Sequence, residues 1–214
     1  MRVPVCLAVF GLAALSGCFT PADPEDGAND VGGPGNDDGE TVPEGVTYAD
    51  EGRWAQGDRW SYSTAIAIEG AEPITVSHTL TVEGEERHEG FEAYRVRSSK
   101  GDGSTVYYTQ DDLNPIQGEH EVPYYSFPLW VGKAWNVTRA DPTQPGVAKV
   151  EAHEEKGSTA GVFLSWRIKL TYESGAIEYY WFADGVANEI RHEVRSDDFT
   201  TVIDLQSYHR EDGA

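Results

Sequence analysis

The stretch from Gly161 to Val194 constrains the fold most, because its apolar side chains recur at every second position. This alternation predicts strands with one buried face. Ser174-Gly175 and Asp184-Gly185 divide the stretch, and both pairs suit the tight turns of hairpins. We therefore predict three consecutive antiparallel strands, the first with its buried face formed by Leu164, Trp166, Ile168, Leu170 and Tyr172.

The rest of the chain repeats this pattern in shorter segments. Aromatic and β-branched residues are frequent, which favours strands, and no amphipathic helical segment is present. The segment from Asp111 to Pro128 contains three prolines, so we predict a loop that crosses the structure. The further predicted strands run from Arg59 to Ile68, Ile74 to Val82, Phe91 to Ser98, Ser104 to Gln110, Trp135 to Arg139, Val147 to Glu154 and Phe199 to Tyr208.

About ten strands in one domain cannot remain a flat open sheet, because strands twist and exposed edges promote aggregation. The predicted fold class is therefore all-β, a strongly curved antiparallel sheet in the form of a half-barrel or barrel. The last predicted strand, Phe199 to Tyr208, is expected to close the sheet.

The formal net charge of −21 argues against nucleic acid as a partner, because a phosphate-binding surface needs clustered Lys and Arg. It also argues against anionic membranes as direct partners. Residues 47–214 remain acidic, with 29 Asp and Glu against 15 Lys and Arg. We interpret this acidity as a means of solubility at an exposed location.

The N-terminus has the pattern of a processed export signal. Met1-Arg2 precedes an apolar run to Leu15 that is shorter than the roughly 20 residues of a membrane-spanning helix. Leu15-Ser16-Gly17-Cys18 resembles the lipobox of bacterial lipoproteins. This resemblance implies cleavage before Cys18, diacylglycerol on its thiol and acylation of the new amino group. Phe19 follows where inner-membrane lipoproteins often carry Asp, so we expect the outer membrane, on its periplasmic or surface side.

A tether then connects the anchor to the folded part. From Phe19 to Val46 the chain is rich in Pro, Gly, Asp and Glu and has no Lys or Arg, a composition typical of disordered linkers. The predicted organisation is a signal peptide in residues 1–17, a lipidated Cys18 with an acidic linker to residue 46, and one β domain in residues 47–214.

Four short motifs carry a second resemblance, which covers about residues 57–208. Together they resemble a group of β-rich envelope lipoproteins, domains of unknown function similar in shape to the LolA and LppX lipid carriers. The resemblance implies a curved antiparallel sheet around an apolar hollow. Ala187 departs from the pattern, which usually has a second Gly there, and the helices that usually cover the hollow are not found. The motifs are Gly57-Asp58-Arg59-Trp60-Ser61-Tyr62, Phe127-Pro128-Leu129-Trp130-Val131-Gly132-Lys133-Ala134-Trp135, Ala160-Gly161-Val162-Phe163, and Tyr179-Tyr180-Trp181-Phe182-Ala183-Asp184-Gly185-Val186.

Catalytic signatures are absent from the sequence. There is no Gly-x-Ser-x-Gly nucleophile elbow, and the six histidines lack the spacing of a helical zinc pair. We therefore predict no enzyme, no metal and no cofactor. A hydrolase or metal enzyme assembled from distant His and Glu is the less favoured alternative.

Large aromatic side chains are the candidate ligand site, because apolar cavities are commonly lined by them. The alternative is that they only fill the core. His78 shares a strand face with Val76 and Leu80, which is typical of a core histidine held by a hydrogen bond. The candidate cavity residues are Trp166, Ile168, Tyr179, Trp181 and His78.

The sequence thus predicts a non-catalytic, lipid-anchored envelope protein. Its sheet is expected to bind an apolar ligand or an envelope partner in its concavity. The alternative is a structural or interaction lipoprotein with a fully packed core. An enclosed apolar volume of about 300 Å³ or more would favour the ligand.

Overall fold

A computed structural model of the protein describes residues 41–50, 52–101, 103–138, 145–196 and 198–211. The described chain is all-β, as predicted, and contains no helix long and apolar enough to cross a membrane. The leader, Cys18 and most of the predicted linker lie outside the described residues. The strands are β1 Arg59–Ile68, β2 Ile74–His88, β3 Phe91–Ser98, β4 Thr105–Thr109, β5 Ile116–Gln117, β6 His120–Glu121, β7 Ala134–Val137, β8 Gly146–Ser158, β9 Gly161–Tyr172, β10 Ile177–Ala183, β11 Asn188–Arg195 and β12 Phe199–His209.

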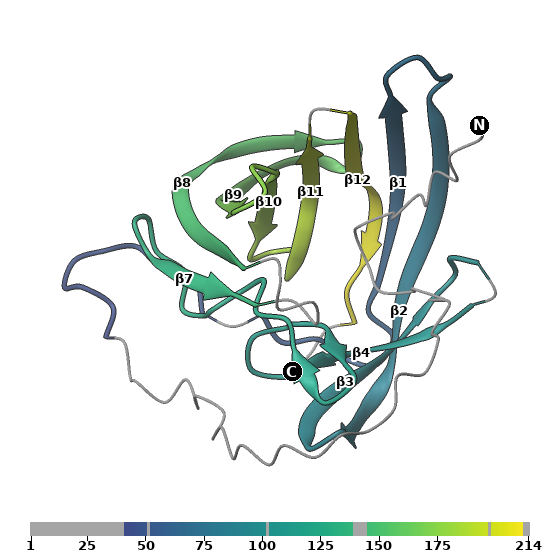
Figure 1. Cartoon of the computed structure of the whole chain (residues 1–214). Coiled ribbons are helices and arrows are strands. Elements are labelled where there is room, and N and C mark those ends of the chain that lie inside the picture. The colour runs from purple at the N-terminus through teal and green to yellow at the C-terminus, as the bar shows by residue number, and fades with distance from the viewer. Residues whose placement is uncertain (1–40, 51, 102, 139–144, 197, 212–214) are drawn as a thin grey trace, which may run out of the picture.

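Ten of these strands form one antiparallel sheet in the order β4-β3-β2-β1-β12-β11-β10-β9-β8-β7, while β5 and β6 pair separately. Nearly every neighbour in the sheet is also a neighbour in sequence, as expected for strands joined by short turns. The exception is β12, which lies between β1 and β11 in the middle of the sheet (Figure 1). The last strand therefore joins two halves of the sheet, β1–β4 and β7–β11.

Several predicted boundaries change. β2 continues past Val82 to His88. A bulge between Val82 and Gly84 shifts the register, and β2 then pairs with β3 from Leu80 to His88, along the whole length of β3. β8 is likewise longer than predicted, with a bulge between Val150 and Ala152. The predicted loop after Asp111 contains the short β5–β6 hairpin.

One side of the sheet, which we call the core face, carries the hydrophobic core. β1 illustrates the cause, since its apolar side chains alternate with small polar ones and only the apolar set, including Trp60 and Tyr62, is buried. Removing an apolar side chain of this size from water contributes about 1.5–3 kcal/mol, so each strand presents that set to the same side. We call the opposite side the outer face.

Two mostly irregular segments cover the core face: residues 41–50 with 52–58, and residues 110–133, which include the β5–β6 hairpin. They are joined by a two-way backbone bridge, in which the N–H of Ala49 donates to Leu129 O at 2.9 Å and the N–H of Leu129 donates to Ala49 O at 2.8 Å. The segments contribute Trp54, Tyr125 and Leu129 to the same core cluster as the strands. Loops thus occupy the place in which the lipoprotein resemblance implied helices.

The tip of the β8–β9 hairpin reaches β12 on the outer face. The N–H of Ala160 donates to Leu205 O at 3.0 Å, and Thr159 Oγ1 donates to Asp204 Oδ2 at 2.7 Å. In a flat sheet the four intervals from β8 to β12 would separate these strands by about 19 Å. The long hairpin therefore folds back over β10 and β11, and its bent path is visible in β8 in Figure 1.

Candidate functional site

Three of the five predicted cavity residues lie on the core face. Trp166 and Ile168 of β9 and His78 of β2 are all at most 4% exposed. Trp166 and Ile168 are two residues apart on one strand, whereas His78 lies beyond β10, β11, β12 and β1 in the order of the sheet. The core face therefore brings two of the candidates together and places the third in the other half of the sheet.

Tyr179 and Trp181 of β10 lie on the outer face. Trp181 pairs laterally with Arg167 and Arg191, and Tyr179 pairs with Lys169, all of them outer-face residues. These two aromatic residues are thus separated from Trp166 and Ile168 by the thickness of the sheet. Their core-face neighbours on the same strand are Tyr180 and Phe182, both buried.

Both faces of β10 are covered, which explains how the strand carries large aromatic residues on each side. On the core face, the Tyr180 ring lies 5.6 Å from that of Tyr124 in the covering segment. On the outer face, the returning β8–β9 hairpin places the Lys156 Nζ 3.7 Å from the centre of the Trp181 ring. The Trp181 Nε1–H donates to Glu154 Oε1 at 3.1 Å.

His78 is buried without the hydrogen bond that a core histidine usually has. Neither ring nitrogen has a hydrogen-bond partner among the described residues, and the ring stacks on Tyr62 at 5.4 Å. Burial, reinforced by the positive charge of Lys100, lowers the pKa of His78 to about 4. The imidazole is therefore neutral at pH 7, with a donor and an acceptor that are both unused.

A buried polar cluster on β10 and β11 was not predicted from the sequence. The Tyr180 hydroxyl donates to Glu178 Oε2, and His192 Nε2 lies 3.3 Å from the same oxygen. Burial raises the pKa of Tyr180, so the hydroxyl keeps its proton and remains a donor. The signal that could have revealed the cluster is the pairing of Glu178 and Tyr180 at the spacing of one strand face, next to His192 on the following strand.

Glu189 of β11 faces the same side from the neighbouring strand. It is 8% exposed, and burial raises the pKa of its carboxyl group. Its backbone carbonyl accepts a 3.0 Å hydrogen bond from the Tyr62 hydroxyl, which links β11 to β1 across the core. Glu178, Tyr180, His192 and Glu189 thus form a polar interior within an aromatic core. Glu178, His192 and Glu189 do not form a metal site, because no group of three or more His, Cys, Asp or Glu in the described ranges could hold a metal ion.

The covering segments fill the core face with their own side chains. Tyr125 packs on Phe182 at 5.5 Å, and Phe127 packs on Phe182 at 5.2 Å. Asn114 holds this segment in shape, since its Oδ1 accepts from the Tyr125 N–H at 2.7 Å and its Nδ2 donates to Tyr125 O at 2.9 Å. An apolar ligand would have to displace these residues to reach Trp166 or Ile168.

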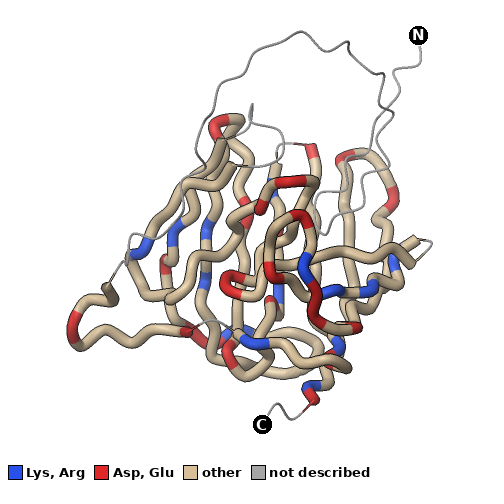
Figure 2. Tube along the Cα trace, turned by 90° about the horizontal axis from the view of Figure 1, so that it is seen from below, with Lys and Arg blue, Asp and Glu red and all other residues tan. Residues whose placement is uncertain are grey.

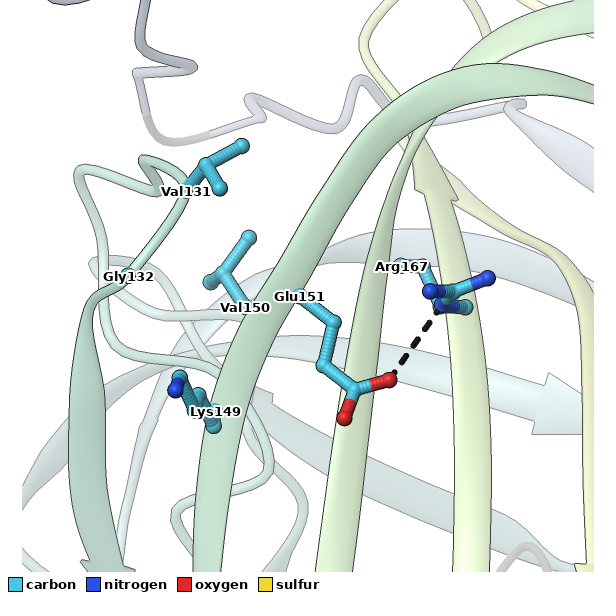
Figure 3. Close-up of a pocket in the computed structure, with 6 residues that line it drawn as sticks. All are labelled: Val131, Gly132, Lys149, Val150, Glu151 and Arg167. Carbon is cyan, nitrogen blue, oxygen red and sulfur yellow. Dashed lines mark ion pairs between the residues drawn. The ribbon is translucent and has the colours of Figure 1, made fainter.

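A pocket of about 400 Å³ is present elsewhere, between β8 and the loop that leads into β7. Figure 3 shows the acidic Glu151 between the basic residues Lys149 and Arg167, with Val131 on the facing loop. The Arg167 Nε lies 3.4 Å from Glu151 Oε2. The loop is fixed to β8 because Gly132 N–H donates to Val150 O at 2.9 Å and Val150 N–H donates to Lys133 O at 2.9 Å.

The basic residues of β8–β12 all lie on the outer face. They are six in number, and four acids share the outer face of β8–β12 with them: Glu151, Glu154, Glu193 and Asp204. Figure 2 shows basic positions side by side on neighbouring strands, with further basic positions elsewhere on the molecule. The six are Lys149, Lys156, Arg167, Lys169, Arg191 and Arg195.

No family model and no curated protein matches the sequence. The chain is similar in fold to solved structures of proteins described as exported, as a lipoprotein or as a LolA superfamily member. A protein described as exported, with a YmcC-like fold, from Bacteroides fragilis matches with a TM-score of 0.49 at 8% identity, covering 76% of this chain and 100% of that one. A protein described as a lipoprotein from Parabacteroides distasonis matches with a TM-score of 0.35 at 9% identity, covering 76% and 100%.

A LolA superfamily protein from Nitrosomonas europaea is also similar, with a TM-score of 0.35 at 13% identity, covering 78% of this chain and 91% of that one. Identities and scores this low carry no function from these proteins to this one. The functional argument therefore depends on the residues of the chain itself.

Proposed function

We propose that the chain is a non-catalytic envelope protein, anchored to the membrane by acyl groups on Cys18, whose single β domain acts by binding another envelope component. The observation that carries this proposal is the filled core face. Trp54, Leu113, Tyr125 and Leu129 of the covering segments belong to the same buried cluster as the strands. A domain whose interior is occupied by its own side chains presents its surface, rather than a hollow, to a partner.

The anchor is supported by the residues around Cys18. Leu15-Ser16-Gly17 precede this cysteine as in a lipobox, and the apolar run before them is too short to span a bilayer. Each buried methylene contributes about 0.8 kcal/mol, and stable anchoring takes more than one chain, so three acyl chains would hold the protein firmly. Phe19 at the next position favours the outer membrane.

Binding of an apolar ligand at the core face is the second candidate function, and His78 favours it. This residue is buried with two unused nitrogens, which a ligand with a polar head group would satisfy. To contact Trp166 and Ile168 as well, the apolar part of such a ligand would have to extend across β1, β12, β11 and β10, which separate these residues from His78 in the sheet. This alternative requires Tyr124, Tyr125 and Phe127 to move from the core face.

The intact mass of the mature chain tests the anchor. We expect the wild-type chain to begin at Cys18 and to carry the added mass of diacylglycerol and one acyl chain. The Cys6→Ser variant is the matched control and should give the same mature mass, because Cys6 lies in the leader. An unmodified Cys18 in wild-type protein from membranes would refute the proposed anchor.

Native mass spectrometry of protein from membranes in mild detergent separates the two functions. A filled core predicts the mass of the acylated chain alone. A bound ligand predicts an additional noncovalent mass that is lost in Ile168→Trp, which enlarges a core-face side chain, and kept in Leu164→Trp, which enlarges an exposed one. That result would support the ligand-binding function and contradict the proposal of a fully packed core.

A further inference from the structure

Two lysines face each other directly on the outer face of β8 and β9. Lys149 and Lys169 are cross-strand partners in the register of the two strands. Like charges directly opposite each other destabilise a sheet. The nearest acid is Glu151, whose carboxylate lies 3.9 Å from Lys169 Nζ and also 3.4 Å from Arg167 Nε. Lys149 has no ion pair with any described residue and is exposed.

This lysine pair borders the pocket of about 400 Å³, which Lys149 and Arg167 line directly. Two glutamates therefore face three cations at the edge of this open volume, because Arg167 Nη1 also lies 3.1 Å from Glu154 Oε1, and Lys149 is the cation left without an ion pair among the described residues. A site that retains uncompensated positive charge in a domain of 29 acidic and 15 basic residues is complementary to an anion.

An acidic segment of the same chain ends, at its C-terminal side, close to this pocket. Ala49 is hydrogen-bonded to Leu129, two residues before Val131, which lines the pocket. The chain that precedes this bridge, residues 19–46, has eight Asp and Glu and no Lys or Arg. The described chain therefore enters the domain near the loop that borders the pocket of Lys149 and Arg167.

We propose that the cationic site formed by Lys149, Arg167 and Lys169 binds an acidic polypeptide segment, and that residues 19–46 of the same chain supply it. The attraction is between exposed charges, each pair of which contributes about 0.2–1 kcal/mol, so it depends on several contacts and weakens with salt. This binding would keep the β8–β9 outer face occupied by the chain's own segment, and a stronger polyanion would compete for it. The inference is independent of the lipid anchor and of the state of the core face.

Zero-length carbodiimide crosslinking of the whole chain, followed by peptide mapping, tests this proposal. The reagent joins a lysine amine to a carboxylate in contact with it, and the chain has five lysines. The pairs Lys169–Glu151 and Lys156–Glu193, each 3.9 Å apart, are internal positive controls. We expect crosslinks from Asp and Glu of residues 19–46 to form with Lys149 and Lys169 several-fold more often than with Lys100.

Salt and a single substitution then separate binding from chance proximity. We expect the segment's crosslinks to Lys169 to fall several-fold in 1 M NaCl, where the Debye length is about 3 Å, and in Lys149→Gln. The matched control, Lys100→Gln, should leave them unchanged. Equal crosslinking of the lysines, or crosslinks that ignore salt, would overturn the proposal. An equal mixture of light and heavy-isotope chains that gives mixed crosslinks would instead assign the segment to a second copy and overturn binding within one chain.

Discussion

The indole N–H of Trp54 donates a hydrogen bond of 2.7 Å to the backbone carbonyl of Ala187, 133 residues further along the chain. Trp60 makes a parallel bond of 3.0 Å to the carbonyl of Val186. Two indoles thus hold the turn between β10 and β11. Ala187 has a φ of 50°, the region in which Gly is commonest, and the turn keeps its shape with a β-carbon present. The first covering segment is fastened to the sheet at this point.

Removing the Trp54 indole should therefore loosen the covering segment. We expect Trp54→Phe to lower the free energy of unfolding by about 1 kcal/mol through the lost hydrogen bond, and Trp54→Ala to lower it by about 3–5 kcal/mol through the cavity as well. Urea denaturation followed by tyrosine and tryptophan fluorescence measures both. Tyr48→Ala, in the same segment but 47% exposed, is the control and should change stability by less than either variant. Equal losses in Trp54→Ala and Tyr48→Ala would contradict the packing described above.

Any side chain at Gly52 should lower the stability of the protein, because the covering segment passes closely over the sheet at this position. A β-carbon at this position would lie 3.1 Å from Ala187 Cβ, 3.2 Å from the Phe182 ring and 3.3 Å from Leu113 Cδ1. We expect Gly52→Ala to cost about 1–3 kcal/mol of stability through overpacking. Gly185→Ala is the control, since no atom lies within 4 Å of its added β-carbon. Thermal unfolding of the two variants in parallel would reveal the difference, and a Gly52→Ala protein as stable as the control would show that the segment can shift.

The pH dependence of stability should carry the signature of His78. Its pKa is about 6.5 in an unfolded chain and about 4 in the folded protein, so the unfolded state binds more protons between these values. Stability present above about pH 6.5 is then lost as the pH falls toward 4, by up to about 3 kcal/mol. We expect His78→Leu to remove this loss and, by deleting two unpaired nitrogens, to raise stability at pH 7 by about 1 kcal/mol. Free energies of unfolding from pH 4 to 7 measure the effect. His120→Leu, at an exposed position, should keep the wild-type slope.

Asp112 should change the pH dependence of stability in the opposite direction to His78. Burial raises the pKa of its carboxyl from 3.8 to about 6, so the folded state binds more protons than the unfolded state in that window. Stability therefore falls as the pH rises from about 4 to 6, by about 2 kcal/mol. In Asp112→Asn the side-chain oxygen can still accept the 2.6 Å hydrogen bond from the Phe127 N–H, and the charge is gone. We expect this variant to be more stable than wild type at pH 7.5 and equal to it near pH 4. Asp111→Asn removes only the smaller repulsion that the exposed Asp111 exerts on Asp112, so it should stabilise the protein at pH 7.5 less than Asp112→Asn does. A variant less stable than wild type at pH 7.5 would show that the ionised carboxylate is needed.

The architecture was accessible from the sequence wherever a strand has one buried face. Trp60 and Tyr62 alternate with small polar residues, and the alternation alone predicts β1 and its buried side. It could not predict that β2 continues to His88, because the residues after the bulge are charged and lack an apolar face. The alternation also could not place β12, because the order of strands depends on which strand edges meet in space. The expectation that this strand would close the sheet was wrong, because β12 lies in the middle of it.

The candidate site was less accessible, for a related reason. Alternation places Tyr180 and Trp181 on opposite faces of one strand. It does not show which face of β9 shares a side of the sheet with either of them, so the predicted cavity contains both Trp166 and Trp181 although they lie on opposite faces. The covering segments are irregular, with Tyr125 and Leu129 in a proline-rich loop, so no periodic pattern marks them as core. The polar cluster of Glu178, Tyr180 and His192 joins two strands, and its members become neighbours only through the register of β10 and β11.

The central place of β12 has a consequence for how the protein folds. Within the sheet, β1 and β11 do not pair with each other, and residues 199–209 pair with both of them. Pairing between β1 and β12 also joins residues about as distant in sequence as the domain allows, and such contacts form slowly. Until β12 is in place, β1 and β11 each keep an unpaired edge, so the sheet is incomplete without this strand. The pairing of β12 is thus the step that joins the two halves into one sheet.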